Sequence, residues 1–178
     1  SLEVWGIEMN RSAAERAASV LDVVLPGSME DNLEKLPKGH FDIVTFNDVL
    51  EHLDSPEAAL EEVRPLLSRE GVVIASIPNI RYWRVLRELL LAKDFRYRPH
   101  GIMDETHRWF FTEKSMHRLF RRAGYQVRRS CGIHPTGSRR FKLLNTILFG
   151  ALADMAFHQF VIVAAPRAES PMTKREER

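Results

Sequence analysis

The feature that most constrains the fold is an alternation of short apolar runs with helix-like segments along most of the chain. The apolar runs have the length and composition of buried strands, and several end at Pro or Gly. Strands are therefore expected at residues 4–7, 23–25, 41–46, 72–77, 125–133 and 159–165. We expect the run at 41–46 to be buried on both faces, as strands inside a parallel sheet are.

Helix signals lie between these runs. Ser55 and Pro56 suit the start of one helix, Asn79 is placed to cap another, and Thr112 and Gly124 bracket a third. Alternating strands and helices predict an α/β fold with a mainly parallel sheet and helices on both faces. In such sheets ligands bind beyond the carboxyl ends of the strands, so the residues that follow each strand are the first candidates for a functional site.

Composition indicates one globular domain. The chain has 178 residues, of which 44% are hydrophobic and 28% charged, as is typical of a single folded unit. We expect residues 1–166 to form that domain and residues 167–178 to be a polar, disordered tail. The single Cys131 excludes an internal disulfide, no signal-peptide pattern opens the chain, and no apolar run has transmembrane length. A cytoplasmic protein is therefore expected.

Charge is distributed unevenly along the chain. Lys and Arg number 6 against 15 Asp and Glu through Pro78, and 20 against 9 from Asn79 onward. A basic second half fits either solvated Arg-rich helices or an anionic small-molecule substrate. No nucleic-acid-binding motif accompanies it, so no nucleic acid partner is expected.

Two segments of the second half stand out. Residues 93–109 form a long irregular stretch dense in Arg, His and aromatic residues, which would cover a substrate. Residues 141–155 are apolar nearly all round, which is typical of a buried helix or of a contact in a homodimer or on a membrane surface.

Glu8 ends the first expected strand and is a candidate ligand-binding residue. A carboxylate there can accept hydrogen bonds from both hydroxyls of a ribose. The same position is acidic in dinucleotide-binding enzymes, and a solvent-exposed carboxylate near a helix start would look the same in sequence. The seven His are scattered without ligand spacing and Cys131 lies in no catalytic motif, so we expect no metal site and no activated nucleophile.

Two segments carry a more specific signal. Residues 41–56, FDIVTFNDVLEHLDSP, and residues 64–79, RPLLSREGVVIASIPN, resemble the S-adenosylmethionine-dependent methyltransferases of the Rossmann-like class. YWR at 82–84, LLL at 89–91 and DETHRWFFT at 104–112 are similar to the small-molecule branch of that superfamily. The resemblance covers about residues 4–133. It implies a Rossmann-like sheet with an antiparallel last strand and S-adenosylmethionine as the cofactor.

The resemblance also implies roles for individual residues. Glu8 would hold the cofactor ribose, and Asn47 would lie beside the methionine part of the cofactor. The residues that would flank the adenine are Met9, Met29 and Glu30. Ser28 departs from the family, which often carries an acidic residue at this position.

Two histidines are candidate catalytic residues. His52 follows the strand that ends near Asn47, and His107 lies in the long basic loop. Either one is placed to remove a proton from an oxygen or nitrogen acceptor, although a His at the position of His52 also commonly bonds local backbone. The predicted reaction is methyl transfer to an O, N or C atom of a small molecule.

The largest departure from the family is the absence of its glycine-rich GxGxG turn, which belongs to the strand before the one that ends at Glu8. The sequence therefore begins at the family's second strand and is expected to form an N-terminally incomplete sheet. We expect a segment outside this sequence, or a partner, to supply the central strand; otherwise cofactor binding should be weak or lost. Two other interpretations stay open: a non-catalytic methyltransferase-like binding or assembly module, and an NAD-dependent oxidoreductase.

Overall fold

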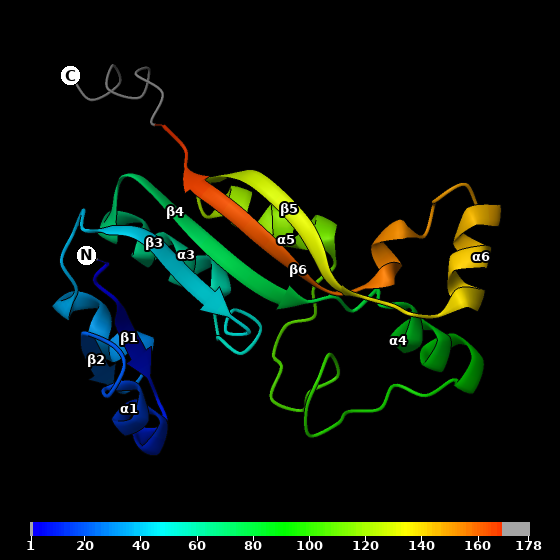
Figure 1. The fold of residues 1–178 in the computed structure, drawn as a ribbon, viewed down its shortest axis with the longest axis horizontal. Coiled ribbons are helices and arrows are strands. Elements are labelled where there is room, and N and C mark those ends of the chain that lie inside the picture. The colour runs from blue at the N-terminus through cyan, green and yellow to red at the C-terminus, as the bar shows by residue number, and fades with distance from the viewer. Residues whose placement is uncertain (1, 169–178) are drawn as a thin grey trace.

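The strands form two separate sheets in the computed structural model, which describes residues 2–168 (Figure 1). One sheet is a parallel pair, β1 (Trp5–Glu8) and β2 (Val23–Pro26). The other has four strands in the order β3-β4-β6-β5. These strands are β3 (Phe41–Asn47), β4 (Leu67–Pro78), β5 (Tyr125–Pro135) and β6 (Phe157–Pro166).

Strand directions confirm the predicted α/β fold. β3 runs parallel to β4, whereas the last strand, β6, is antiparallel to both β4 and β5. Within residues 2–168, no strand pairs with the free edge of β1 or with the free edge of β3. The strands of residues 2–168 therefore do not form one continuous sheet, and β1 and β3 each keep an unpaired edge.

The amino-terminal unit consists of the parallel pair and short helices. α1 (Arg11–Ala17) starts where the Asn10 side chain accepts the backbone N–H of Ala13, at 3.0 Å. α2 (Met29–Asn32) is capped by Ser28 and continues into a 3₁₀ turn, Leu33–Lys35. Met29 and Leu33 pack against the core of the four-stranded sheet, so α2 and the turn after it connect the parallel pair to the larger sheet.

One hydrophobic core lies under the four-stranded sheet. α3 (Pro56–Val63) and α5 (Glu113–Arg122) contribute Leu60, Met116 and Phe120, which have no exposed surface. Along β4, buried and half-buried residues alternate from Gly71 to Ile77, as the two-residue period of a strand requires.

The predicted helix signals around α3 and α5 are confirmed. Ser55 caps α3 by accepting the N–H of Ala58, and Pro56 occupies the first turn. Thr112 and Ser115 form a reciprocal capping box at α5. Gly124 ends that helix with φ +81°, a conformation that favours glycine.

The expectation that residues 41–46 are buried on both faces is wrong. Asp42, Ile43 and Thr45 are exposed, with Ile43 at 55%, because β3 is the edge strand of its sheet. β4 also begins earlier than predicted, at Leu67. It passes through Gly71 at a register shift opposite β3, and a Cβ on Gly71 would lie 2.8 Å from the carbonyl oxygen of Phe41.

Asn79 does not cap a helix as predicted. α4 (Trp83–Arg87) starts after Tyr82 and leads into a π-helical turn, Glu88–Ala92. Asn79 is fully buried, and its Nδ2 donates hydrogen bonds to the carbonyl oxygens of Asp154 (2.9 Å) and Phe157 (3.0 Å). Asn79 therefore joins the end of β4 to the start of β6. Without these hydrogen bonds its buried side-chain amide would have no partner.

The expected helix at 141–155 divides into α6 (Arg139–Ile147) and a 3₁₀ turn, Ala153–Ala156. Phe141 is buried and Leu152 and Met155 are half-buried, whereas five large apolar side chains are exposed: Leu143, Leu144, Ile147, Leu148 and Phe149. No helix in the described part of the chain combines the length and apolarity that crossing a bilayer requires. Most of the predicted tail, 169–178, lies outside the described residues.

Candidate functional site

The carboxyl ends of β1 and β3 carry the residues that the sequence singles out. Glu8 is the last residue of β1, and Asn47 is the last residue of β3. In Figure 1 the arrows of these two strands point toward the same side of the molecule. Ligands of α/β sheets bind at this side, so the strand ends define the candidate site.

Glu8 is held in a defined orientation. Its Oε1 accepts the backbone N–H of Asn10 at 2.8 Å, and its carbonyl oxygen accepts the N–H of Gly27 at 3.0 Å. The second contact ties the end of β1 to the end of β2. Gly27 has φ +115°, which an L side chain rarely adopts, so this turn depends on glycine.

The other predicted cofactor residues occupy different surroundings. Met9 is 78% exposed and lines an open hollow together with Pro26 and Gly27. Met29 is half-buried against the core, whereas Glu30 and Asn47 are exposed. The structure therefore leaves Met9 free to contact a ligand, but it commits part of Met29 to packing.

A second group of residues follows β3. The chain turns at Asp48, which has φ +52° and whose Oδ1 accepts a 2.6 Å hydrogen bond from Gln159 Nε2. Asp tolerates this left-handed conformation better than most residues. The turn then places Glu51 inside the protein, with 1% of its side chain exposed, and the half-buried His52 next to it.

The long loop brings His107 to the same place. The backbone N–H groups of Arg108 and Trp109 donate to the carbonyl oxygen of Glu51, at 2.9 and 3.1 Å. The rings of His52 and His107 meet edge to face with their centroids 4.7 Å apart. Folding thus unites both predicted catalytic histidines with Glu51, although they lie far apart in the sequence.

Burial governs the charges in this group, which we call the Glu51 cluster (Glu51, His52 and His107). Burial, reinforced by the nearby negative charge of Asp48 and opposed by the residue's own backbone N–H, raises the pKa of Glu51 to about 7. Burial also lowers the pKa of His107, which keeps its imidazole neutral near pH 7. Neither carboxylate oxygen of Glu51 has a hydrogen-bond partner among the described residues.

Aromatic side chains border the Glu51 cluster. Phe95 contacts Tyr97 and Phe110 edge to face, with centroid distances of 5.6 and 6.0 Å. Phe110 in turn lies 6.1 Å from the ring of His107. These contacts give the loop an apolar wall beside the two histidines.

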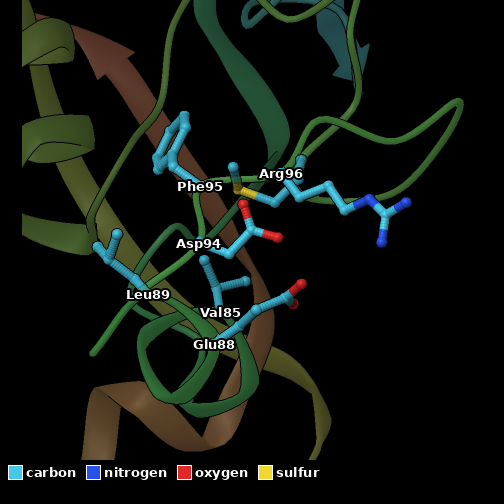
Figure 2. A pocket seen from close by; sticks show the side chains of 7 residues that line it. Val85, Glu88, Leu89, Asp94, Phe95 and Arg96 are labelled. Atoms are coloured by element: carbon cyan, nitrogen blue, oxygen red, sulfur yellow. The ribbon is translucent and has the colours of Figure 1, made fainter. Parts of the chain in front are cut away.

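Figure 2 shows a pocket between α4 and this loop, with Val85, Leu89 and Phe95 among its lining residues. Its volume of about 10 Å³ admits one water molecule at most. The side chain of Arg96 extends away from it in this view. The pocket is therefore too small to hold a substrate in this conformation.

Several basic residues near the loop are already paired. Arg81 contacts Asp154, Arg98 contacts Glu88 at 2.7 Å, and Arg108 contacts Asp54. The positive charge of the second half is therefore not all available to an anionic substrate.

Sequence reasoning missed Glu51. Its adjacency to His52 was visible, but nothing in the spacing of His residues linked it to His107. The long loop supplies that link through backbone hydrogen bonds, which leave no mark in the sequence.

Comparison with known proteins identifies relatives of this arrangement. A family model described as "Methyltransferase domain" matches residues 1–130. A SAM-dependent methyltransferase from Archaeoglobus fulgidus has a similar structure, with a TM-score of 0.60 and 13% identity over 90% of this chain and 74% of that one. No curated protein matches the chain significantly.

Two further solved structures share the fold. A SAM-dependent methyltransferase from Thermotoga maritima has a TM-score of 0.58 and 18% identity, covering 94% of this chain and 84% of its own. An S-adenosylmethionine-dependent methyltransferase from Mesorhizobium loti has a TM-score of 0.56 and 16% identity, covering 93% and 80%.

Proposed function

The chain belongs to the methyltransferase-domain family, and from this premise we propose that it transfers a methyl group from S-adenosylmethionine to a small-molecule acceptor. The proposal depends most on one observation. Glu8 and Asn47 end two parallel strands, and Glu51 and His52 follow the second of them, where the long loop adds His107. This arrangement supports a cofactor at one end of the site and an acceptor at the other.

At the cofactor end, Glu8 binds the ribose hydroxyls. The hydrogen bond from Asn10 to Oε1 orients the carboxylate, and within residues 2–168 no group donates to Oε2. A carboxylate that is oriented in this way, with one oxygen free to accept hydrogen bonds, suits the two hydroxyls of a ribose. Met9 lies in the adjoining hollow and covers one face of the adenine, while Asn47 contacts the amino-acid part of the cofactor.

At the acceptor end, the Glu51 cluster orients the acceptor atom and assists the loss of its proton. S-adenosylmethionine supplies an electrophilic methyl group on a sulfonium. The acceptor atom bonds to the methyl carbon, sulfur keeps the electron pair of the broken bond, and an acceptor proton leaves to a base. The neutral state of His107 near pH 7 supports a role in this proton transfer.

The aromatic wall supports a small, partly apolar acceptor. Phe95, Tyr97 and Phe110 lie on the loop that carries His107, so an acceptor bound there would reach the histidines.

The exposed apolar side chains of α6 lie elsewhere and support a contact through residues 141–155 with a second copy or a membrane surface. Sedimentation of the free chain tests for a dimer, and co-sedimentation with vesicles tests for a membrane contact.

Ligand titration separates the methyltransferase from the alternatives. Together with the segment or partner expected to supply the central strand, the chain should bind S-adenosylmethionine and its demethylated product, S-adenosylhomocysteine, but not NAD. A non-catalytic module would show no methyl transfer to any acceptor, and an oxidoreductase would prefer NAD. Selective binding of NAD, or binding of none of the three, would overturn the proposal.

Two variants assign the ends of the site. Glu8→Ala should weaken cofactor binding at least about 10-fold, because a charge-assisted hydrogen bond is lost. Glu34→Ala, at an exposed Glu of the same amino-terminal unit, is the matched control and should leave cofactor binding unchanged. His107→Ala should lower turnover far more than it lowers cofactor affinity. An unchanged rate would remove His107 from the mechanism.

A further inference from the structure

The Glu51 cluster has the composition of a metal site. Glu51, His52 and His107 each place one potential ligand atom within 4.8 Å of the others. The side chains of Glu51 and His107 are 1% and 5% exposed. A carboxylate buried this deeply is normally paired with a cation or with hydrogen-bond donors, yet both oxygens of Glu51 are unpartnered among the described residues.

The distance between Glu51 and His107 favours an ion between them over direct contact. Oε1 of Glu51 lies 4.0 Å from Nε2 of His107, too far for a hydrogen bond. A transition-metal ion binds carboxylate oxygen and imidazole nitrogen at about 2.0–2.2 Å, so two such ligands on opposite sides are up to about 4.2 Å apart. The observed separation therefore accommodates one ion with little movement of either side chain.

Hydrogen bonds orient both imidazoles with one nitrogen toward the cluster. Nδ1 of His107 lies 3.1 Å from the carbonyl oxygen of Ile102, an acceptor only, so Nδ1 carries the proton and Nε2 keeps its lone pair. Backbone carbonyls and carboxylates commonly hold metal-binding histidines in this way.

His52 is oriented by a similar relay. The hydroxyl of Thr106 donates to Asp104 Oδ1 at 2.6 Å. Its oxygen is then an acceptor for Nδ1 of His52, 3.1 Å away, and the Thr106 carbonyl oxygen lies 3.3 Å from the same nitrogen. Nδ1 of His52 therefore carries the proton, which leaves Nε2 to bind a cation.

The backbone assembles these ligands before any ion binds. The carbonyl oxygen of Glu51 accepts the N–H groups of Arg108 and Trp109, and Trp109 Nε1 donates to the carbonyl oxygen of Leu53 at 3.0 Å. The segment that carries Glu51 and His52 is thus fastened to the loop that carries His107. Asp48 adds a further negative charge close by.

We propose that Glu51, His52 and His107 bind a divalent first-row transition-metal ion. Two imidazoles and one carboxylate suit Mn²⁺, Fe²⁺, Co²⁺ or Zn²⁺ better than Mg²⁺, which prefers oxygen ligands. Three protein ligands leave coordination positions open, so the ion would take an oxygen atom of the acceptor. The Nε2 lone pair of His107 would then be on the ion, so His107 would act as a ligand and not as the base, and the acceptor's proton would leave to solvent. This binding of the acceptor rests on the proposed function and narrows the acceptor to a hydroxyl-bearing small molecule; metal binding itself does not.

Direct metal titration tests the proposal. Tag-free, chelator-treated full chain is titrated with Zn²⁺, Co²⁺ and Mg²⁺, with Co²⁺ binding followed by its visible absorption. We expect one equivalent of Zn²⁺ or Co²⁺ to bind, and Mg²⁺ to bind at least about 100-fold more weakly. Absence of stoichiometric Zn²⁺ and Co²⁺ binding would overturn the proposal.

Variants locate the site. Glu51→Gln and His52→Ala should each weaken Co²⁺ binding at least about 100-fold, because each removes one of three ligands. His100→Ala, an exposed His on the same loop, should bind as the wild type does. Wild-type affinity in both ligand variants would overturn the proposal, and circular dichroism confirms that each variant is folded. His52→Ala affects a half-exposed residue and so keeps the test valid if Glu51→Gln does not fold.

Cofactor binding is measured separately on the same samples. S-adenosylhomocysteine affinity should be unchanged in His52→Ala, because His52 belongs to the acceptor end. If His52→Ala loses metal binding but binds S-adenosylhomocysteine as the wild type does, the result would support the metal site. Metal binding without S-adenosylhomocysteine binding would support the metal site and contradict the proposed methyltransferase.

Discussion

The β1–β2 unit and the four-stranded sheet differ sharply in how much they bury. In residues 2–40 only Ala14 and Asn32 are buried. The four-stranded sheet, its helices and their connections, by contrast, contribute all the buried residues of the main core, including Leu60, Phe120 and Ile162. Every strand position in β1 is half-buried.

The proposed site spans both regions. Glu8 and Met9 belong to the thinly packed unit, whereas the Glu51 cluster is held against the large core. Segments with few buried apolar contacts open locally at low free energy. We therefore expect the acceptor end to be rigid before ligands bind and the cofactor end to gain order from its ligand.

Matched leucine truncations test the difference in packing and should have the largest effect. Leu60→Ala, at a position with no exposed surface, should reduce the free energy of unfolding by about 2–5 kcal/mol. Leu25→Ala, at a half-buried position in β2, should cost about 1 kcal/mol. Urea unfolding followed by circular dichroism measures both. Equal losses would show that the two regions are packed alike.

Matched glycine substitutions probe the same contrast with a smaller effect. A Cβ on Gly132 in β5 would clash with the ring of Phe157, so Gly132→Ala should cost about 1–3 kcal/mol. A Cβ on Gly6 in β1 would meet only the end of the Leu21 side chain, at 2.7 Å. That end can rotate away, and Gly6→Ala should cost less than about 1 kcal/mol. A larger loss for Gly6→Ala would contradict the account of a loosely packed β1.

Acidification should weaken the four-stranded sheet through His158, with the smallest effect. Burial lowers the pKa of His158, the neighbouring His134 adds to this shift, and the negative charge of Asp48 opposes it. The folded state thus favours neutral His158, so stability is complete above the unfolded pKa of about 6.5 and falls as pH decreases below it. His158→Gln should lose less stability than the wild type between pH 8 and pH 5 in thermal unfolding. An identical loss in both proteins would exclude His158.

Local sequence signals predicted helix starts and ends well, because interactions between neighbouring residues determine them. Ser55 and Pro56 predicted the start of α3, and Thr112 and Gly124 predicted the bounds of α5, because capping depends on neighbouring residues. The burial of residues 41–46 was predicted wrongly, because an apolar run does not reveal whether its strand is central or at an edge. Asn79 was assigned wrongly because its partners, Asp154 and Phe157, are distant in sequence.

The candidate site was also predictable only in part, because local sequence position indicates some of its residues and long-range packing brings in the others. Glu8 ends β1 and His52 lies shortly after the end of β3, and positions at strand ends indicate a site. The union of His52 with His107 required the path of the long loop. The unpartnered carboxylate of Glu51 became visible only with the three-dimensional structure, because burial and missing partners are properties of packing.

Hydrogen exchange with and without S-adenosylhomocysteine tests the central claim most directly. At a ligand concentration about 100 times its Kd, the account predicts that amides of β1 and β2 exchange up to about 100-fold more slowly, because the ligand must leave before this unit opens. Amides in the middle of β4 and β6, already protected by the core, should change little. Unchanged exchange in β1 and β2 despite saturated binding, or slowing confined to the four-stranded sheet, would contradict a cofactor held by the end of β1.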